Sequence, residues 1–193
     1  MTAGFSASAT ADIVLLTRVA GRDAVALGEL YDRHSRLLFS LILRVLRDRG
    51  ESEDVLQEVF VRVWQRADSY SQALGTPLAW LVRIARNRAI DRLRSRKVRA
   101  NVGESYEDPP VLADPAPTAN PEQLARTAEH HRAIVAALAQ LPAEQRLLID
   151  AAYFEGYTQS ELADRFNLPL GTVKTRIRTA MQSLRSSLAS LAD

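Results

Sequence analysis

The sequence of 193 residues predicts an all-α protein with two small helical domains joined by an extended, acidic and proline-rich linker. Apolar residues recur at spacings of three and four along most of the chain, which is the period of an amphipathic helix. No segment alternates apolar and polar residues in the manner of a convincing strand. Residues 101–121 carry five prolines and four acids and cannot form a packed core. We therefore place the domains at residues 11–99 and 122–193, with the linker at 100–121.

The first domain is predicted to contain four helices, at about residues 12–19, 23–46, 52–64 and 77–96. In the third of these helices, Ser52 can cap the amino terminus, and acids follow it in the first turn. The inward-facing residues of that helix are Val55, Leu56, Val59 and Val63. The buried stripe of the fourth helix consists of Leu78, Val82, Ala85, Ala89 and Leu93. These stripes supply the core of the domain.

The outer face of the predicted helix at 52–64 is acidic, with one apolar residue in its middle. It consists of Asp54, Gln57, Glu58, Val61 and Gln65. By itself, this pattern is typical of a solvated helix face.

The predicted helix at 77–96 carries a second row of residues beside its buried stripe. This row is Trp80, Arg83, Asn87 and Arg94, at steps of three, four and seven. An indole, an amide and two guanidinium groups can stack on unpaired bases and hold a phosphate backbone. Packing of Trp80 against neighbouring helices is an equally good interpretation. Residues 83–99 hold eight Lys and Arg side chains against one acid, and these repel one another unless an anion neutralises them.

The second domain is predicted to contain helices at about residues 122–140, 143–154, 159–166 and 170–188. The last two form a helix-turn-helix at 159–178, because Thr158 and Glu161 make a capping box and Pro169 can open the next helix. The predicted buried stripe of the final helix is Val173, Ile177, Met181, Leu184 and Leu188.

The opposite face of that final helix is polar and basic. It presents Thr172, Lys174, Thr175, Arg176, Arg178, Thr179 and Gln182, with no acid between positions 172 and 185. Short polar side chains flanked by cations suit the major groove of DNA, where they meet base edges and phosphates. A solvated amphipathic helix pair is the alternative interpretation. We expect Thr172, Lys174, Thr175, Arg176 and Arg178 to contact DNA.

Composition narrows the classes of function. The chain has no cysteine, so disulfides and thiolate metal sites are excluded, and a reducing compartment is expected. We expect all three histidines, His34 included, to be solvated, and we expect no metal and no cofactor. No signal peptide is apparent, and the longest apolar stretch is too short to span a bilayer, which indicates a soluble, cytoplasmic protein. The net charge of +2 is segregated into two basic segments, which suggests two contacts with one polyanion.

Two parts of the sequence resemble the extracytoplasmic-function (ECF) group of bacterial sigma-70 factors. Domain two of that group is similar to LGELYDRHSRLLFSLILRVLRDRGESEDVLQEVFVRVWQRADSY followed by GTPLAWLVRIARNRAIDRLRSRKVR. Domain four is similar to LAQLPAEQRLLIDAAYFEGYTQSELADRFNLPLGTVKTRIRTAMQSLR. The resemblance implies a promoter-specificity subunit that binds core RNA polymerase, melts the −10 element and holds the −35 element. Pro169 departs from the family, whose members often have Ser there.

The resemblance also implies roles for single residues and partners. Asp54, Gln57, Glu58 and Val61 would meet the β′ clamp helices of the polymerase, whose β flap is a further implied contact. The −10 strand would be bound by Trp80, Arg83, Arg86, Asn87, Arg88 and Arg94, with a flipped base in the loop at 68–76. The −35 duplex would be read by the five residues of the last helix. The linker would follow the RNA exit path, and an anti-sigma factor, often a membrane protein, would regulate the chain.

Two other classes of function remain as alternatives. A stand-alone helix-turn-helix repressor or activator would bind duplex DNA without polymerase, and it would not need the second basic row around Asn87. An enzyme acting on nucleic acid is less favoured, because no cluster of carboxylates or histidines has metal-ligand spacing and no glycine-rich phosphate loop occurs. We therefore expect a protein that is not an enzyme.

Overall fold

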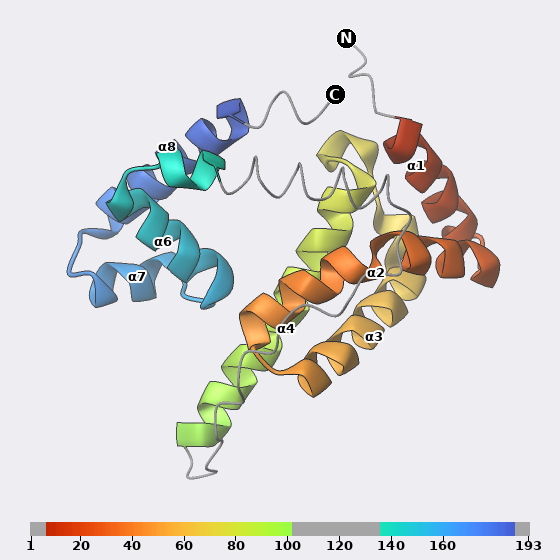
Figure 1. Ribbon diagram of the computed structural model, residues 1–193, viewed down its shortest axis with the longest axis horizontal. Helices are drawn as coiled ribbons and strands as arrows, with labels where there is room; N and C mark the ends of the chain where they lie inside the picture. The colour runs from red at the N-terminus through yellow and green to blue at the C-terminus, as the bar shows by residue number, and fades with distance from the viewer. Residues whose placement is uncertain (1–6, 102–135, 188–193) are drawn as a thin grey trace. The chain divides into compact units, whose positions relative to one another are not determined.

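The computed structural model describes residues 7–101 and 136–187, and it divides the chain into two compact units, Met1–Leu112 and Ala113–Asp193. Every regular element in the described residues is an α or a 3-10 helix, without any strand (Figure 1). The predicted all-α fold with two helical domains is confirmed. The predicted boundaries of the linker stay a prediction, because residues 102–135 lie outside the described residues.

Unit 1 is built from four long helices and two short 3-10 turns. They are α1 Ala7–Ala20, α2 Ala24–Leu46, α3 Arg49–Arg66, η1 Ala67–Ser69, η2 Gln72–Leu74 and α4 Pro77–Asn101. The helices α2, α3 and α4 pack against one another, and α1 packs on α2 (Figure 1). Their facing sides bury large apolar residues, among them Leu16, Leu30, Leu38, Ile42, Leu46, Val55, Val59, Val63 and Leu81.

The helix ends of unit 1 are set by aspartates. Asp23 caps α2 by accepting hydrogen bonds from the amides of Val25 (2.9 Å) and Ala26 (3.2 Å). Asp48 caps α3 by accepting from the amide of Glu51 at 2.8 Å, so α3 begins before the predicted cap at Ser52. The Ser52 hydroxyl is buried inside the helix and donates to the Asp48 carbonyl instead. The expected start of this helix was wrong because Asp48 is the better-placed acceptor.

The prediction of a solvated His34 was also wrong. His34 is buried, and its Nε2 lies 2.9 Å from Oδ2 of the buried Asp12 on α1. The other oxygen of Asp12 pairs with Nε of Arg33 at 3.1 Å. A buried carboxylate requires such partners. The pair was missed because Asp12 and His34 lie on different helices, and the sequence pattern of one helix does not show its contacts with another. The other two histidines lie outside the described residues.

Unit 2 contains α6 Ala143–Phe154, α7 Gln159–Arg165 and α8 Leu170–Ser187, and residues 136–140 are also helical. Both hydrogen bonds of the predicted capping box at Thr158 and Glu161 are present. The chain turns between α7 and α8 through Asn167, whose φ of +49° lies in the left-handed region that asparagine tolerates. The arrangement α7, turn, α8 is the predicted helix-turn-helix.

The core of unit 2 corrects one residue of the predicted stripe. Leu148, Ala151, Leu162 and Val173 form one buried cluster, and Leu141, Ile149 and Ala180 form another. On α8 the buried side therefore runs through Ala180, and Met181 is exposed. The spacing of apolar residues predicted that Met181 is buried. The structure instead buries the smaller Ala180, in one cluster with Ile149 of α6. Leu188 lies outside the described residues.

Candidate nucleic-acid interface

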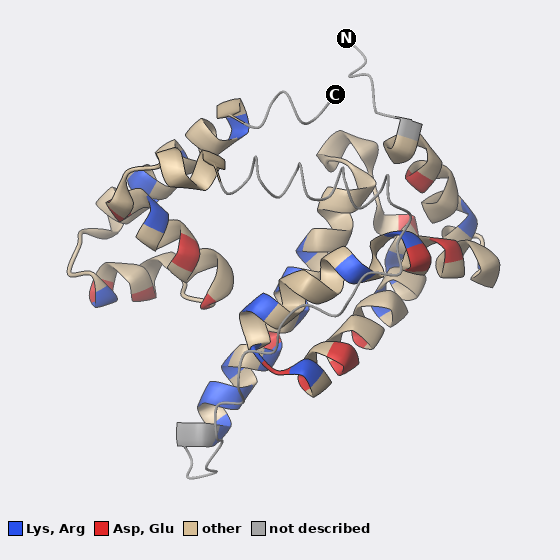
Figure 2. Ribbon diagram, viewed as in Figure 1, with Lys and Arg blue, Asp and Glu red and all other residues tan. Residues whose placement is uncertain are grey.

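The predicted reading face lies along α8. Lys174, Thr175 and Arg178 are exposed, whereas Thr172 and Arg176 are half-buried. Figure 2 shows basic residues along α8 and acidic residues on α6 and α7. Lys174 and Arg178 make no ion pair with any residue in the described ranges. The Arg176 Nη2 lies 2.8 Å from Oε2 of Glu144 on α6, a contact that the sequence pattern of α8 could not indicate.

The predicted −10 contact residues lie on α4, and they differ in how exposed they are. Arg83, Asn87 and Arg94 are exposed, and Arg86 and Arg88 are half-buried. The three exposed side chains lie on the outer side of a helix that otherwise packs on α1, α2 and α3.

Trp80 does not belong to that exposed row. Its side chain is 8% exposed, and its ring meets the ring of Tyr70 edge-on at a centroid distance of 5.9 Å. Of the two interpretations of Trp80, the geometry agrees with packing against neighbouring elements.

The predicted stripe of α4 was partly wrong: Ala85, Ala89 and Leu93 are buried, but Leu78 and Val82 are only half-buried. Because α4 packs on three helices, its buried arc also takes in Leu81 and Ile90.

The loop between α3 and α4, which was predicted to receive a flipped base, is ordered by the turns η1 and η2 and by a hydrogen bond that closes it. The Tyr70 hydroxyl donates a hydrogen bond of 3.0 Å to the Gly75 carbonyl, which closes the loop. Burial raises the pKa of the Tyr70 phenol, so the hydroxyl keeps its proton. Gly75 has a φ of +132°, a backbone conformation that favours glycine. Between these two residues, Leu74 is exposed to solvent.

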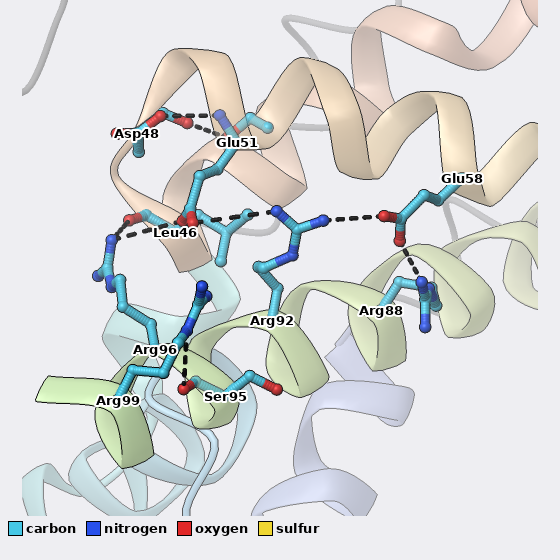
Figure 3. Close-up of polar contacts among 10 residues, drawn as sticks. Leu46, Asp48, Glu51, Glu58, Arg88, Arg92, Ser95, Arg96 and Arg99 are labelled. Carbon is cyan, nitrogen blue, oxygen red and sulfur yellow. Dashed lines mark hydrogen bonds and ion pairs between the residues drawn. The ribbon is translucent and has the colours of Figure 1, made fainter. Parts of the chain in front are cut away.

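An alternating ladder of charges joins α3 to α4 (Figure 3). Glu58 pairs with Arg88 and, at 2.8 Å, with Arg92. Glu51 pairs with Arg92 at 3.9 Å and with Arg96 at 3.6 Å. Arg96 also donates to the Leu46 carbonyl at 3.3 Å, at the carboxyl end of α2, where the helix dipole is negative.

This ladder lowers the repulsion that was expected among the cations of α4. Arg88, Arg92 and Arg96 pair within unit 1 with two acids of α3, which offset two of their three positive charges. Sequence reasoning missed these pairs because the acids lie 30 or more positions earlier in the chain. The cations left for an external polyanion are therefore fewer than the eight in the sequence.

The predicted polymerase-binding residues come together in one groove of about 440 Å³ on α3 and α4. It is lined by Asp54, Gln57, Glu58, Val61, Arg62, Gln65, Arg88 and Arg92. Val61 is exposed among these polar and charged residues. The groove also contains Arg88, so residues predicted to meet polymerase and DNA adjoin here.

Comparison with protein families agrees with this division. Residues 30–99, which cover most of unit 1, match the family Sigma-70 region 2. Residues 137–186, which cover the helix-turn-helix, match the family Sigma-70, region 4. The two cationic helices α4 and α8 fall in different matched regions.

Relatives of similar length match across both regions. The chain is 37% identical over 180 residues to the ECF RNA polymerase sigma factor SigK of Mycobacterium bovis, covering 90% of this chain and 91% of the relative. It is 36% identical to SigK of a further Mycobacterium species, with 91% and 89% covered. Among solved structures, Rhodobacter sphaeroides SigE in complex with the anti-sigma ChrR is 28% identical, with a TM-score of 0.46 and coverage of 92% and 98%. The chain belongs to the ECF family of RNA polymerase sigma factors.

Proposed function

We propose that this sigma factor binds core RNA polymerase through the groove of α3 and binds promoter DNA through α4 and α8. In this proposal α8 reads the −35 duplex, and α4 with the loop at 68–76 binds the melted −10 strand. The chain contributes binding and orientation, acts in the cytoplasm, and performs no catalysis of its own. Across residues 7–101 and 136–187, no helix is long and apolar enough to cross a membrane.

One observation carries the proposal: two exposed cationic helix faces occur in two separate units. On α8, Lys174, Thr175 and Arg178 are exposed beside one another on a helix without acids. On α4, which follows a closed loop, Arg83, Asn87 and Arg94 are exposed. Duplex DNA is read from the major groove by a single helix, whereas an opened strand needs a separate surface of cations and hydrogen-bonding groups.

The groove on α3 and α4 supports the polymerase contact. Asp54 and Gln57 are exposed, and Glu58 borders the groove with Val61 exposed beside it. An exposed apolar side chain in a rim of carboxylates and guanidinium groups fits a helical partner that presents an apolar contact with charged side chains around it. We propose that the partner is the pair of β′ clamp helices.

We further propose that an anti-sigma factor controls the protein by covering its cationic faces. An inhibitor that covers both Arg83 on α4 and Arg178 on α8 would block both DNA contacts at once. Acidic groups on such a partner would complement these guanidinium groups. Anchoring of that partner in the membrane is part of the same proposal.

The test is transcription in vitro with purified core RNA polymerase over a randomised promoter library. We expect the chain to confer start sites and to enrich two separated sequence elements. If the chain bound duplex DNA but gave no polymerase-dependent start sites, a stand-alone helix-turn-helix regulator would be the better description. If it neither bound DNA nor gave start sites, the assignments on both α4 and α8 would be wrong.

A further inference from the structure

We propose that Glu144 is a positioning residue that holds Arg176 for reading one base of the −35 duplex. Glu144 lies in the first turn of α6, outside the helix-turn-helix, and it is the acid that reaches the reading face of α8. The inference rests on the proposed reading of duplex DNA by α8, and it adds a specificity-determining contact to that function.

The contact joins two helices that are fixed to each other. Nη2 of Arg176 and Oε2 of Glu144 are 2.8 Å apart, with side chains 32% and 68% exposed. The same two helices share a buried cluster, formed by Ile149 of α6, Ala180 of α8 and Leu141, against which Ile177 packs. Since both backbones are held by this core, the ion pair favours one direction of a long side chain that otherwise samples many rotamers, with the small stabilisation typical of an exposed pair.

Arg176 differs in this respect from its basic neighbours. Lys174 and Arg178 are exposed and have no ion pair within the described residues, which suits flexible contacts to phosphates. Arginine carries five N–H donors in a planar fork, so one Nη can be held by Glu144 while the other donors face outward. A fixed guanidinium can donate two parallel hydrogen bonds to O6 and N7 of guanine, the commonest base-specific contact in the major groove. We therefore expect Arg176 to read a guanine.

The same carboxylate has a second, opposite effect on DNA binding. It is exposed beside a cationic face, so it repels phosphates and neutralises one cation. Glu144 should therefore weaken binding to duplexes of arbitrary sequence while it sharpens the choice at one base pair. A residue that only stabilised the fold would change both properties in the same direction.

The test compares Glu144→Gln with Glu155→Gln in the full-length chain. Glu155 is a matched control, because this residue at the end of α6 also makes an ion pair in unit 2, with Arg165 of α7 at 3.4 Å. Binding of a random-sequence duplex is measured by fluorescence anisotropy at several salt concentrations. The sequence preference is measured with the randomised promoter library and core polymerase.

For E144Q we expect about threefold tighter binding of the random duplex, with a salt dependence steeper by about one released counterion. We expect preference at a single −35 position to fall about threefold, with the other positions unchanged, because an exposed ion pair stabilises its geometry only weakly. Arg176→Lys should lose preference at the same position, because lysine cannot make the bidentate contact, and adding E144Q should cause no further loss. E155Q should match the wild-type chain in both measurements.

Two results would overturn the inference while leaving the proposed function intact. One is an E144Q library that returns the wild-type −35 preference. The other is an E144Q preference that weakens equally at all positions, together with weaker binding of random duplex, as partial unfolding would produce. If the wild-type chain itself enriched no −35 element, the proposed function of α8 and this inference would fail together.

Discussion

Trp80 is 8% exposed and packs against Tyr70, so we expect it to contribute to the stability of the fold and not to DNA binding. A ring with that little free surface stabilises the junction between α4 and the loop before it. Base stacking needs an exposed aromatic face. The exposed Arg83 and Asn87, one and two turns further along, are therefore better placed for an opened DNA strand.

We predict that Trp80→Ala lowers the free energy of unfolding of unit 1 by about 3–5 kcal/mol, the usual cost of removing a buried large aromatic residue. Trp80→Phe should cost less and should leave binding of a pre-melted promoter in the holoenzyme unchanged. Arg83→Ala is the control that should weaken this binding without affecting stability. Denaturant unfolding and anisotropy measure the two properties. A folded Trp80→Phe protein that bound as poorly as the Arg83→Ala protein would show that the indole contacts DNA.

Asp23 provides a pH-dependent contribution to the same unit. Hydrogen bonding from the amide of Ala26, followed by the guanidinium of Arg18, lowers the pKa of Asp23 below its ordinary value of 3.8. A carboxylate whose pKa is lower in the folded state stabilises the protein at pH values above the unfolded pKa. That stabilisation disappears as the pH falls through the folded pKa.

We therefore predict that Asp23→Ala lowers the Tm of unit 1 at neutral pH, and that the difference from the wild-type Tm shrinks as the pH falls below about 4. Tryptophan fluorescence reports this transition selectively, because both tryptophans, Trp64 and Trp80, lie in unit 1. Asp32→Ala, at an exposed position of α2 away from its cap, is the control for removal of an aspartate and should leave the Tm at neutral pH close to the wild-type value. A gap in Tm that stayed constant down to pH 2 would contradict the capping role.

At the scale of elements, the contacts between α3 and α4 have two parts with different burial. Glu51 and Arg96 have side chains only 12% and 14% exposed, whereas Glu58 and Arg88 are 35% and 32% exposed. Breaking a buried pair leaves a charge without solvent or partner, while a surface pair is worth about 0–1 kcal/mol. The end of the ladder near Leu46 should therefore hold the helices together, and the end near Glu58 should be easily opened.

We predict that Glu51→Gln destabilises unit 1 by about 2–3 kcal/mol, somewhat less than the 3–5 kcal/mol typical of fully buried pairs. Glu58→Gln should cost about 1 kcal/mol or less and should act mainly on polymerase affinity. Denaturant unfolding and a pull-down with core polymerase distinguish the two. Equal losses of stability would mean that burial does not separate the two halves of the ladder.

The sequence predicted those features of the elements that depend on local pattern. The helix-turn-helix followed from Thr158, Glu161 and the break before Pro169, all within one short segment. Other features depend on partners far away in the chain. The burial of His34 depends on Asp12, and the contact of Arg176 depends on Glu144. Periodicity on one helix cannot reveal which charge lies on another, so these pairs required the structure.

For the whole molecule, the charge distribution matters more than its sum. The chain carries only +2, yet basic residues concentrate on α4 in unit 1 and on α8 in unit 2, as Figure 2 shows. Part of the charge on α4 is neutralised by α3, while α8 contributes one pair to α6. Each unit therefore offers a small set of exposed cations, and the proposed function has both units binding one template.

This division predicts that the two units can be impaired separately. Lys174→Ala with Arg178→Ala should weaken binding of the holoenzyme to duplex promoter DNA and reduce its salt dependence by about two released counterions. Transcription should recover on a template whose −10 region is pre-melted and bound by unit 1. Arg83→Ala with Asn87→Ala should keep the closed complex and its salt dependence but lose strand opening, measured by permanganate reactivity. If both double variants failed equally on both templates, the units would act as a single DNA-binding surface.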